Sequence, residues 1–267
     1  MGKLAILALA VLVTSACKAP EESHSKAIIG AVLMDGSGGP PLTNSMVVMA
    51  GDRIRGAGPA STIPIPAQAD KINGGGRFLV PAPVSLTPNI QGRDEAAFAK
   101  AREAGLPAIG RIATLADAEW MLDHGATAFV GMIRDTETLD PDFVAKVRDL
   151  RITFAPALTQ ADTGREIAMR NTLRLFQAGV PIALAGADPL REAEQLAAAG
   201  IPPLDVIVAA TRNGAAALHD GDGGTIQAGK RANLLLLSAN PGEDIRNMAR
   251  VAMRIVNGEI SEAGAGR

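Results

Sequence analysis

Residues 181–199 read PIALAGADPLREAEQLAAA and contain the unit that decides the fold. The first part, 181–188, is a short apolar run, and its length and composition predict a buried β-strand. Asp188 and Pro189 follow, and this pair is typical of a helix start, with Asp188 as the N-cap and Pro189 at the first helical position. We therefore expect a strand followed directly by a helix over 190–199.

The same alternation recurs through the middle of the chain. It predicts a parallel sheet covered by helices. The expected strands lie at 106–113, 126–133, 152–159 and 181–188, preceded by Phe78-Leu79-Val80, which follows a glycine-rich turn. The expected helices lie at 94–104, 115–124, 141–150, 165–179, 190–199 and 203–217. The sequence thus predicts about five parallel strands.

The span 82–222 is too short for a complete eight-stranded α/β barrel. It holds about 140 residues, whereas such barrels typically take about 250 residues. We expect an α/β fold with an incomplete barrel. A cut barrel has two exposed edge strands, which are templates for pairing with another chain. A homodimer across these edges is therefore expected, or else a rearranged open sheet or marginal stability.

Both ends of the chain have the texture of β structure. Residues 27–81 are apolar runs broken by turn residues, and residues 223–262 show the same pattern, with Asn257-Gly258 as a hairpin turn. We expect the two segments to form one small composite β-sandwich next to the α/β domain at 82–222.

Composition excludes one class of function. The net charge is −2, the chain has no tyrosine and one tryptophan, and hydrophobic residues make up 47%. Nucleic-acid binding would need a basic surface and is often supported by aromatic stacking platforms. The chain is instead expected to be a globular protein that does not bind nucleic acid.

The N-terminus predicts export. A basic start is followed by the apolar run Leu4–Val13 and small residues before Cys17, as in a bacterial signal peptide with a lipobox-like end. We expect residues 1–17 to be this signal, Cys17 to be lipidated, and 18–26 to be a polar tether. The protein would then be membrane-anchored on the periplasmic or cell-surface side. The alternative is an ordinary secretory signal cut near Ala16. Cys17 is the only cysteine, so no intrachain disulfide can form.

The chain from Ala27 to Ile260 resembles the amidohydrolase superfamily, in particular its imidazolonepropionase-like and Xaa-Pro dipeptidase-like branch. The stretches that carry the resemblance are IIGAVLMDGSGGPPLTNSMVVMAGDRIRGAGP (28–59), DVIVAATRNGAAAL (205–218) and GTIQAGKRANLLLLSANPGEDIRNMARVAMRIVNGEI (224–260). The resemblance implies an incomplete TIM-like barrel with a small β-sandwich.

The resemblance also implies where metal ligands would lie, and most of them are replaced. Thr87-Pro88-Asn89 stands where the family has an HxH pair. Strands two to four of the family's barrel, with its bridging lysine, have no counterpart. Arg111 and Gly131 occupy the places of two further histidines, and Asp188 alone matches a family ligand.

One carboxylate cannot hold a catalytic zinc, which normally has three protein ligands and an open water position. Arg111 would place a permanent positive charge where the cation should bind. We therefore expect no cofactor. His24, His124 and His219 offer no ligand pair, and His124 is expected at the C-terminal end of a helix.

Each remaining site residue has two interpretations. Asp188 caps a helix or retains chemistry. Arg111 and Arg134 make structural ion pairs, or join Thr87 and Asn89 in a small pocket for an anion or carboxylate at the rim of the sheet.

Three hypotheses about function remain open. The first is a degenerate, lipid-anchored amidohydrolase homologue with a binding or scaffold role. The second is an active hydrolase of C–N bonds in small molecules, using zinc at an atypical site around Asp188. The third is an eroded gene product without a role of its own.

Overall fold

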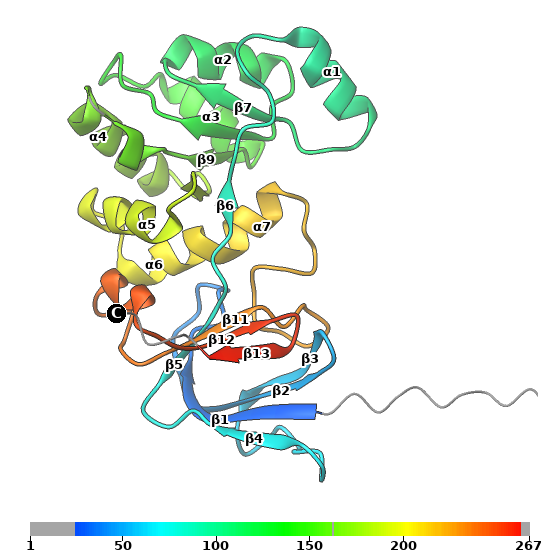
Figure 1. Ribbon diagram of the computed structural model, residues 1–267. Coiled ribbons are helices and arrows are strands. Elements are labelled where there is room, and N and C mark those ends of the chain that lie inside the picture. The colour runs from blue at the N-terminus through cyan, green and yellow to red at the C-terminus, as the bar shows by residue number, and fades with distance from the viewer. Residues whose placement is uncertain (1–24, 162, 263–267) are drawn as a thin grey trace, which may run out of the picture.

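The computed structural model describes residues 25–161 and 163–262. The expected signal peptide, Cys17 and most of the tether lie outside these residues. The described chain has two parts, a β-sheet part built from both ends of the sequence and an α/β part built from the middle (Figure 1). No helix in these residues is long and apolar enough to cross a membrane.

The β-sheet part is one eight-stranded sheet, in the order β13-β12-β11-β5-β1-β2-β3, with β4 paired to β1. The hairpin expected at Asn257-Gly258 joins β12 to β13, and both turn residues have positive φ. Its strands are β1 (Ser25–Leu33), β2 (Leu42–Ala50), β3 (Arg53–Pro59), β4 (Asp70–Asn73), β5 (Phe78–Pro81), β11 (Leu234–Leu237), β12 (Val251–Val256) and β13 (Glu259–Glu262).

Hydrogen bonds connect all these strands into one sheet. The N-terminal and C-terminal segments meet where β5 pairs with β11. The sheet encloses its own core, which includes Ile28, Val47, Leu79 and Leu236, all of them fully buried. Burial of this alternating apolar set joins the two ends of the chain into one unit.

Helices surround the strands of the α/β part. The ends of these helices lie within about two residues of the predicted ends. Asp94, Thr114, Asp140 and Asp188 each accept a backbone N–H as N-cap of the helix that follows. The helices are α1 (Glu95–Glu103), α2 (Leu115–Asp123), α3 (Pro141–Asp149), α4 (Arg165–Gln177), α5 (Pro189–Ala198), α6 (Pro203–Val208) and α7 (Gly214–Ala217). A π-helical turn, Ala209–Asn213, joins α6 to α7.

The strands of the α/β part are short and parallel. They form a two-stranded sheet, β10-β6, and a three-stranded sheet, β7-β8-β9, with no continuous closed barrel in the described residues. Parallel bridges of single residues, Ile90 to Gly110 and Phe154 to Ile182, connect the two sheets. The strands are β6 (Ser85–Leu86), β7 (Ile109–Ile112), β8 (Ala128–Gly131), β9 (Thr153–Ala155) and β10 (Leu184–Ala185).

The assignment of Phe78–Val80 as the first strand of this sheet was wrong. Those residues form β5, which pairs with β1 on one side and β11 on the other. After β5 the chain passes from the β-sheet part into the α/β part, where β6 is the first strand (Figure 1). An apolar run before a proline does not by itself specify which of two neighbouring sheets it joins.

Two layers of buried side chains flank the strands of the α/β part. Large side chains, including Phe98, Phe129 and Phe154, fill the layer between strands and helices. The other faces of the strands meet in a cluster of mostly small side chains that consists of Leu86, Ile109, Val130 and six alanines. Small side chains allow the short strands to approach closely on this inner face.

Candidate functional site

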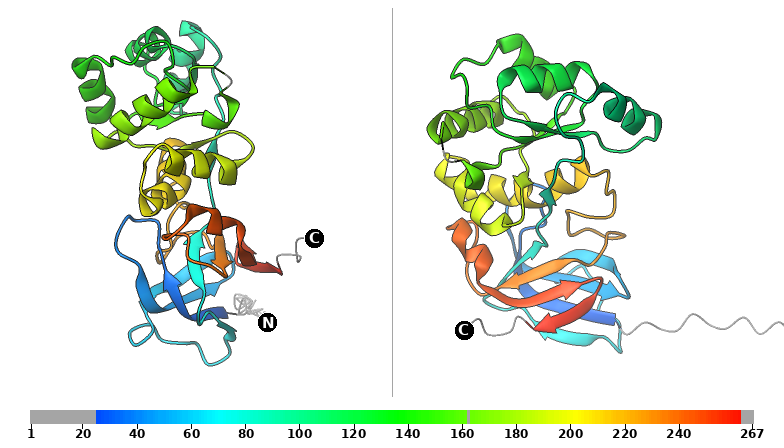
Figure 2. Two further views of the ribbon diagram at one scale, coloured as in Figure 1. Left: turned by 90° about the vertical axis from the view of Figure 1, so that its left-hand side faces the viewer. Right: turned by 45° about the horizontal axis from the view of Figure 1, so that its top comes forward.

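The carboxyl ends of the strands in the α/β part define the candidate site, because ligands bind at this edge in such folds. Thr87 follows β6, Arg111 lies in β7, Gly131 ends β8 and Asp188 follows β10. Because the strands are parallel, they bring these residues to the same edge of the α/β part. Figure 2 shows the α/β part above the β-sheet part in two further views.

Asp188 is exposed and caps α5, as the Asp-Pro pair predicted. Its Oδ1 accepts a hydrogen bond from the backbone N–H of Arg191 at 3.1 Å. Pro189 occupies the first helical position, so it removes one N–H that would otherwise need a partner. The hydrogen bond of the Asp188 carboxylate is thus the one that satisfies a free N–H at the start of α5.

Asn89 has a structural contact as well. Its Nδ2 donates to the carbonyl of Pro107 at 2.8 Å, and its Oδ1 accepts from the backbone N–H of Ile109 at 2.9 Å. The side chain thereby completes the hydrogen bonding at the start of β7. Thr87, two residues earlier, is exposed to solvent.

The two arginines of the predicted pocket lie in different surroundings. Arg111 is exposed, and its Nε donates to Oε1 of Gln91 at 3.0 Å. Arg134 is half-buried, and its Nη1 donates to the carbonyl of Thr163 at 3.4 Å. Arg111 is thus held towards the segment after β6, and Arg134 towards the segment before α4.

Gly131 has a backbone that excludes a side chain. Its φ is +130°, and a Cβ at this position would overlap the carbonyl oxygen of Ile112. Only glycine tolerates both conditions without movement of the neighbouring strand. The resemblance implies a metal-binding histidine at this position. With this backbone conformation, no side chain can be placed there to bind a metal.

The side chains at this edge do not fit a catalytic metal. No group of three or more His, Cys, Asp or Glu side chains able to hold a metal ion occurs in residues 25–161 and 163–262. His124 ends α2, as predicted, and stacks on Trp120 with the ring centres 3.8 Å apart. Its Nδ1 lies 2.7 Å from the carbonyl of Trp120. No catalytic step through a metal follows from these residues.

Comparison with known proteins identifies the family. A model of the amidohydrolase family matches residues 111–261, more than half of the chain. The chain belongs to the amidohydrolase family. No curated protein matches the sequence.

Solved structures show how far this amidohydrolase-family fold extends over the chain. A protein described as a prolidase of Bifidobacterium longum superposes with a TM-score of 0.77 at 17% identity, covering 92% of this chain and 97% of that one. Phenylurea hydrolase B gives 0.75 at 15% identity, with 90% and 97% covered. Molinate hydrolase gives 0.75 at 13%, with 90% and 95% covered. At such identities the likeness shows the fold alone.

Glu192 is a carboxylate of this amidohydrolase-family chain that the sequence reasoning missed. It lies in the first turn of α5 and is completely buried. Its Oε1 accepts the N–H of Leu158 at 2.8 Å and its Oε2 accepts the N–H of Thr159 at 3.0 Å. Burial raises the pKa of this carboxyl group, and the two N–H donors and the charge of Arg165 oppose that rise.

A signal for Glu192 was present in the sequence. Ala193 and Leu196 are buried in α5, and position 192 lies on the same helical face, one residue before Ala193 and four before Leu196. An acidic residue on an apolar face needs buried donors. Here the segment after β9 supplies them, so Glu192 ties α5 to the end of β9.

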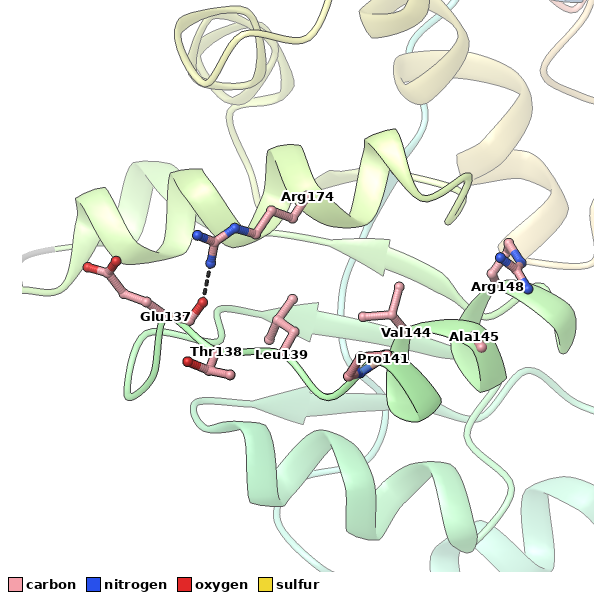
Figure 3. A pocket seen from close by; sticks show the side chains of 8 residues that line it. All are labelled: Glu137, Thr138, Leu139, Pro141, Val144, Ala145, Arg148 and Arg174. Carbon is pink, nitrogen blue, oxygen red and sulfur yellow. Dashed lines mark hydrogen bonds between the residues drawn. The ribbon is translucent and has the colours of Figure 1, made fainter.

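A cavity of about 500 Å³ lies away from this edge, between α3 and α4 (Figure 3). Leu139 and Val144 line it, and Arg174 reaches from α4 to donate to the carbonyl of Glu137. The cavity is a shallow gap between surface helices that neither Thr87 nor Asp188 lines.

Proposed function

We propose that this protein is an exported, lipid-anchored member of the amidohydrolase family that does not carry out metal-dependent hydrolysis. It serves at the membrane surface as a binding or scaffold protein. Its α/β part is an incomplete TIM-like barrel of about five parallel strands.

The observation that carries this proposal is the backbone at Gly131. A histidine cannot occupy this position unless the carbonyl of Ile112 moves. Arg111 adds a permanent positive charge to the same edge. Asp188, the one matching ligand, already accepts the N–H of Arg191. Each of these features opposes a bound dication with an open water position.

The ligand in this proposal is a small anion or carboxylate at the carboxyl edge of the strands. The exposed guanidinium of Arg111 offers N–H donors in the geometry that a carboxylate accepts, and Thr87 offers a hydroxyl. Asn89 and Arg134 complete the proposed pocket. Since Asn89 has both of its polar atoms bound to backbone, it supports the wall of the pocket rather than the ligand.

The second candidate is an active hydrolase of C–N bonds that uses zinc at an atypical site around Asp188. The structural neighbours favour it, since they include a phenylurea hydrolase and a Xaa-Pro dipeptidase. The exposed carboxylate of Asp188 would have to exchange its N-cap hydrogen bond for the metal.

The experiment that separates the candidates is a hydrolysis assay on the chain from Ser25, with and without added zinc. The substrates are a Xaa-Pro dipeptide and an N-acyl amino acid. The proposal predicts that zinc produces no turnover above that of the zinc-containing buffer. Zinc-dependent turnover that disappears in Asp188→Ala but persists in Asp94→Ala, a matched loss of an exposed N-cap carboxylate, would establish the second candidate.

Membrane anchoring has a separate test. Cys17→Ser removes the thiol that the proposal assigns to lipidation. The variant should therefore be absent from the membrane fraction, whereas the wild-type chain should be found in it. Equal distribution of both chains between fractions would refute anchoring through Cys17.

The proposal includes a homodimer formed through sheet edges. In the three-stranded sheet, Ile90 pairs with β7 and Ile182 pairs with β9, so both outer strands have a neighbour. In the large sheet, β13 is an outermost strand. Outer strands present unpaired backbone groups to a second copy. Light scattering on the chain from Ser25 should give the mass of two chains, and the mass of one chain would contradict edge pairing.

A further inference from the structure

A hollow of about 450 Å³ lies at the other end of the strands, and residues of α7 and of the loop 218–231 line it. An adjoining cavity shares His219 with it and is lined by Thr127, Ile152 and Pro181. Thr127 directly precedes β8, Ile152 directly precedes β9, and Pro181 directly precedes Ile182, which pairs with β9. The hollow is therefore near the amino ends of the strands. It is therefore remote from the candidate site at their carboxyl ends.

Two cationic side chains and a histidine line this hollow, which we call the basic pocket (Arg212, His219 and Lys230). Arg212 donates through Nη1 to the carbonyl of Ser37, and Lys230 donates through Nζ to the carbonyl of Gly221. A guanidinium has five N–H donors and an ammonium group has three. Both side chains are thus oriented by the backbone and keep donors for a ligand.

Two carboxylates close to Lys230 and the pocket lining are neutralised by other arginines. Asp220 lines the basic pocket and pairs with Arg231 at 3.1 Å, and Asp222 pairs with Arg53 at 2.7 Å. Neither arginine lines the pocket. In the described part of the chain, Arg212 and Lys230 form no ion pair of their own. The charge inside the pocket is therefore positive.

Close backbone contacts connect the segments that carry the lining residues of the basic pocket. A Cβ at Gly36 would lie 2.6 Å from the carbonyl oxygen of Gly224, and one at Gly224 would lie 2.8 Å from the Cα of Arg212. Both glycines have positive φ. Arg212 itself lies in the π-helical turn 209–213, a conformation that is frequent at functional sites. Such walls need little rearrangement when a ligand binds.

We propose that the basic pocket binds a small organic anion, with its phosphate or carboxylate group between Arg212 and Lys230. Charge-assisted hydrogen bonds from these two side chains would hold the anionic group. A volume of about 450 Å³ falls in the range of small-molecule sites, about 300 to 1,000 Å³. The remaining space therefore suits an organic portion. The inference goes beyond the proposed function and does not depend on whether the carboxyl edge hydrolyses anything.

Calorimetric titration of the full chain with inorganic phosphate, and separately with succinate, tests this proposal. At least one of the two anions should bind, and the tighter one identifies the charged group. Loss of one charge-assisted hydrogen bond should weaken binding about tenfold or more in Lys230→Gln and in Arg212→Gln. Lys230→Arg keeps the charge and should restore most of the affinity.

Arg55→Gln is the matched control, because it removes the same charge from an exposed position in β3 outside the pocket. It should leave the affinity unchanged. Lys230→Gln loses only one carbonyl contact and should unfold at the wild-type temperature, so it decides the outcome if Arg212→Gln is unstable. Failure of both anions to bind, or an affinity in Lys230→Gln that is no weaker than in Arg55→Gln, would overturn the proposal.

Discussion

Gly131 occupies the position at which a metal-binding histidine is expected in the family, and its backbone excludes a side chain there. At this position β8 ends against the carbonyl of Ile112. The sequence predicts the replacement of the histidine but not this contact, because a φ of +130° cannot be read from a single glycine. Glu192 was missed for another reason, since its donors come from a segment more than thirty residues away.

The contact at Gly131 predicts a large loss of stability in Gly131→Ala. The Cβ would overlap Ile112, and backbone strain with overpacking together should lower the free energy of unfolding by about 3 kcal/mol or more. Gly92→Ala is the control, because Gly92 also has positive φ but a Cβ added there would have no other atom within 4 Å. Conformation alone should cost about 1 to 2 kcal/mol there. Equal losses in urea unfolding would contradict the contact.

Burial of Glu192 predicts a pH dependence of stability. Its pKa is raised above the ordinary 4.5, so the folded chain keeps a proton that the unfolded chain releases. Stability from this group is complete below the unfolded pKa and is lost as the pH rises through the folded pKa. Glu192→Gln cannot titrate and should lack this decline when thermal unfolding is followed upward from about pH 4. Glu103→Gln, an exposed carboxylate, should retain it, and a decline that persists in Glu192→Gln would assign it to other groups.

The helices were the most predictable elements. One helix start was marked by the N-cap signal Asp188-Pro189, and this cue depends only on neighbouring residues. The strands were less predictable. Phe78–Pro81 has the composition of a strand, yet its partners β1 and β11 lie far away in sequence in opposite directions. The π-helical turn 209–213 inside the predicted helix 203–217 also had no sequence signal.

The role of Asp188 in α5 can be measured apart from any chemistry. Asp188→Ala removes the N-cap hydrogen bond and should lower the free energy of unfolding by about 1 kcal/mol. Asp188→Asn keeps an oxygen that accepts the N–H of Arg191 and should be nearly neutral. Urea unfolding of the two variants provides the comparison. If Asp188→Asn destabilised the chain as much as Asp188→Ala, the carboxylate would have a role beyond capping.

The described residues form a mixed α/β fold, and the chain belongs to the amidohydrolase family. The sheet that unites both ends of the chain is intact, with β5 paired to β11. The α/β part retains the strand–helix units that hold Arg111, Gly131 and Asp188 at one edge. The resemblance on the quoted stretches predicted the family and this α/β arrangement. It could not predict the pairing among the short strands, because this pairing depends on contacts between residues that lie far apart in the sequence.

Zinc content is the most direct test of this account. The chain from Ser25 is purified without chelator, exposed to zinc, freed of excess metal and measured by mass spectrometry. A catalytic site would hold about one zinc per chain, whereas we predict far less than one, with no difference between the wild-type chain and Asp188→Ala. One or more zinc ions per chain that are lost in Asp188→Ala would contradict the account and establish a metal site at the carboxyl edge of the strands.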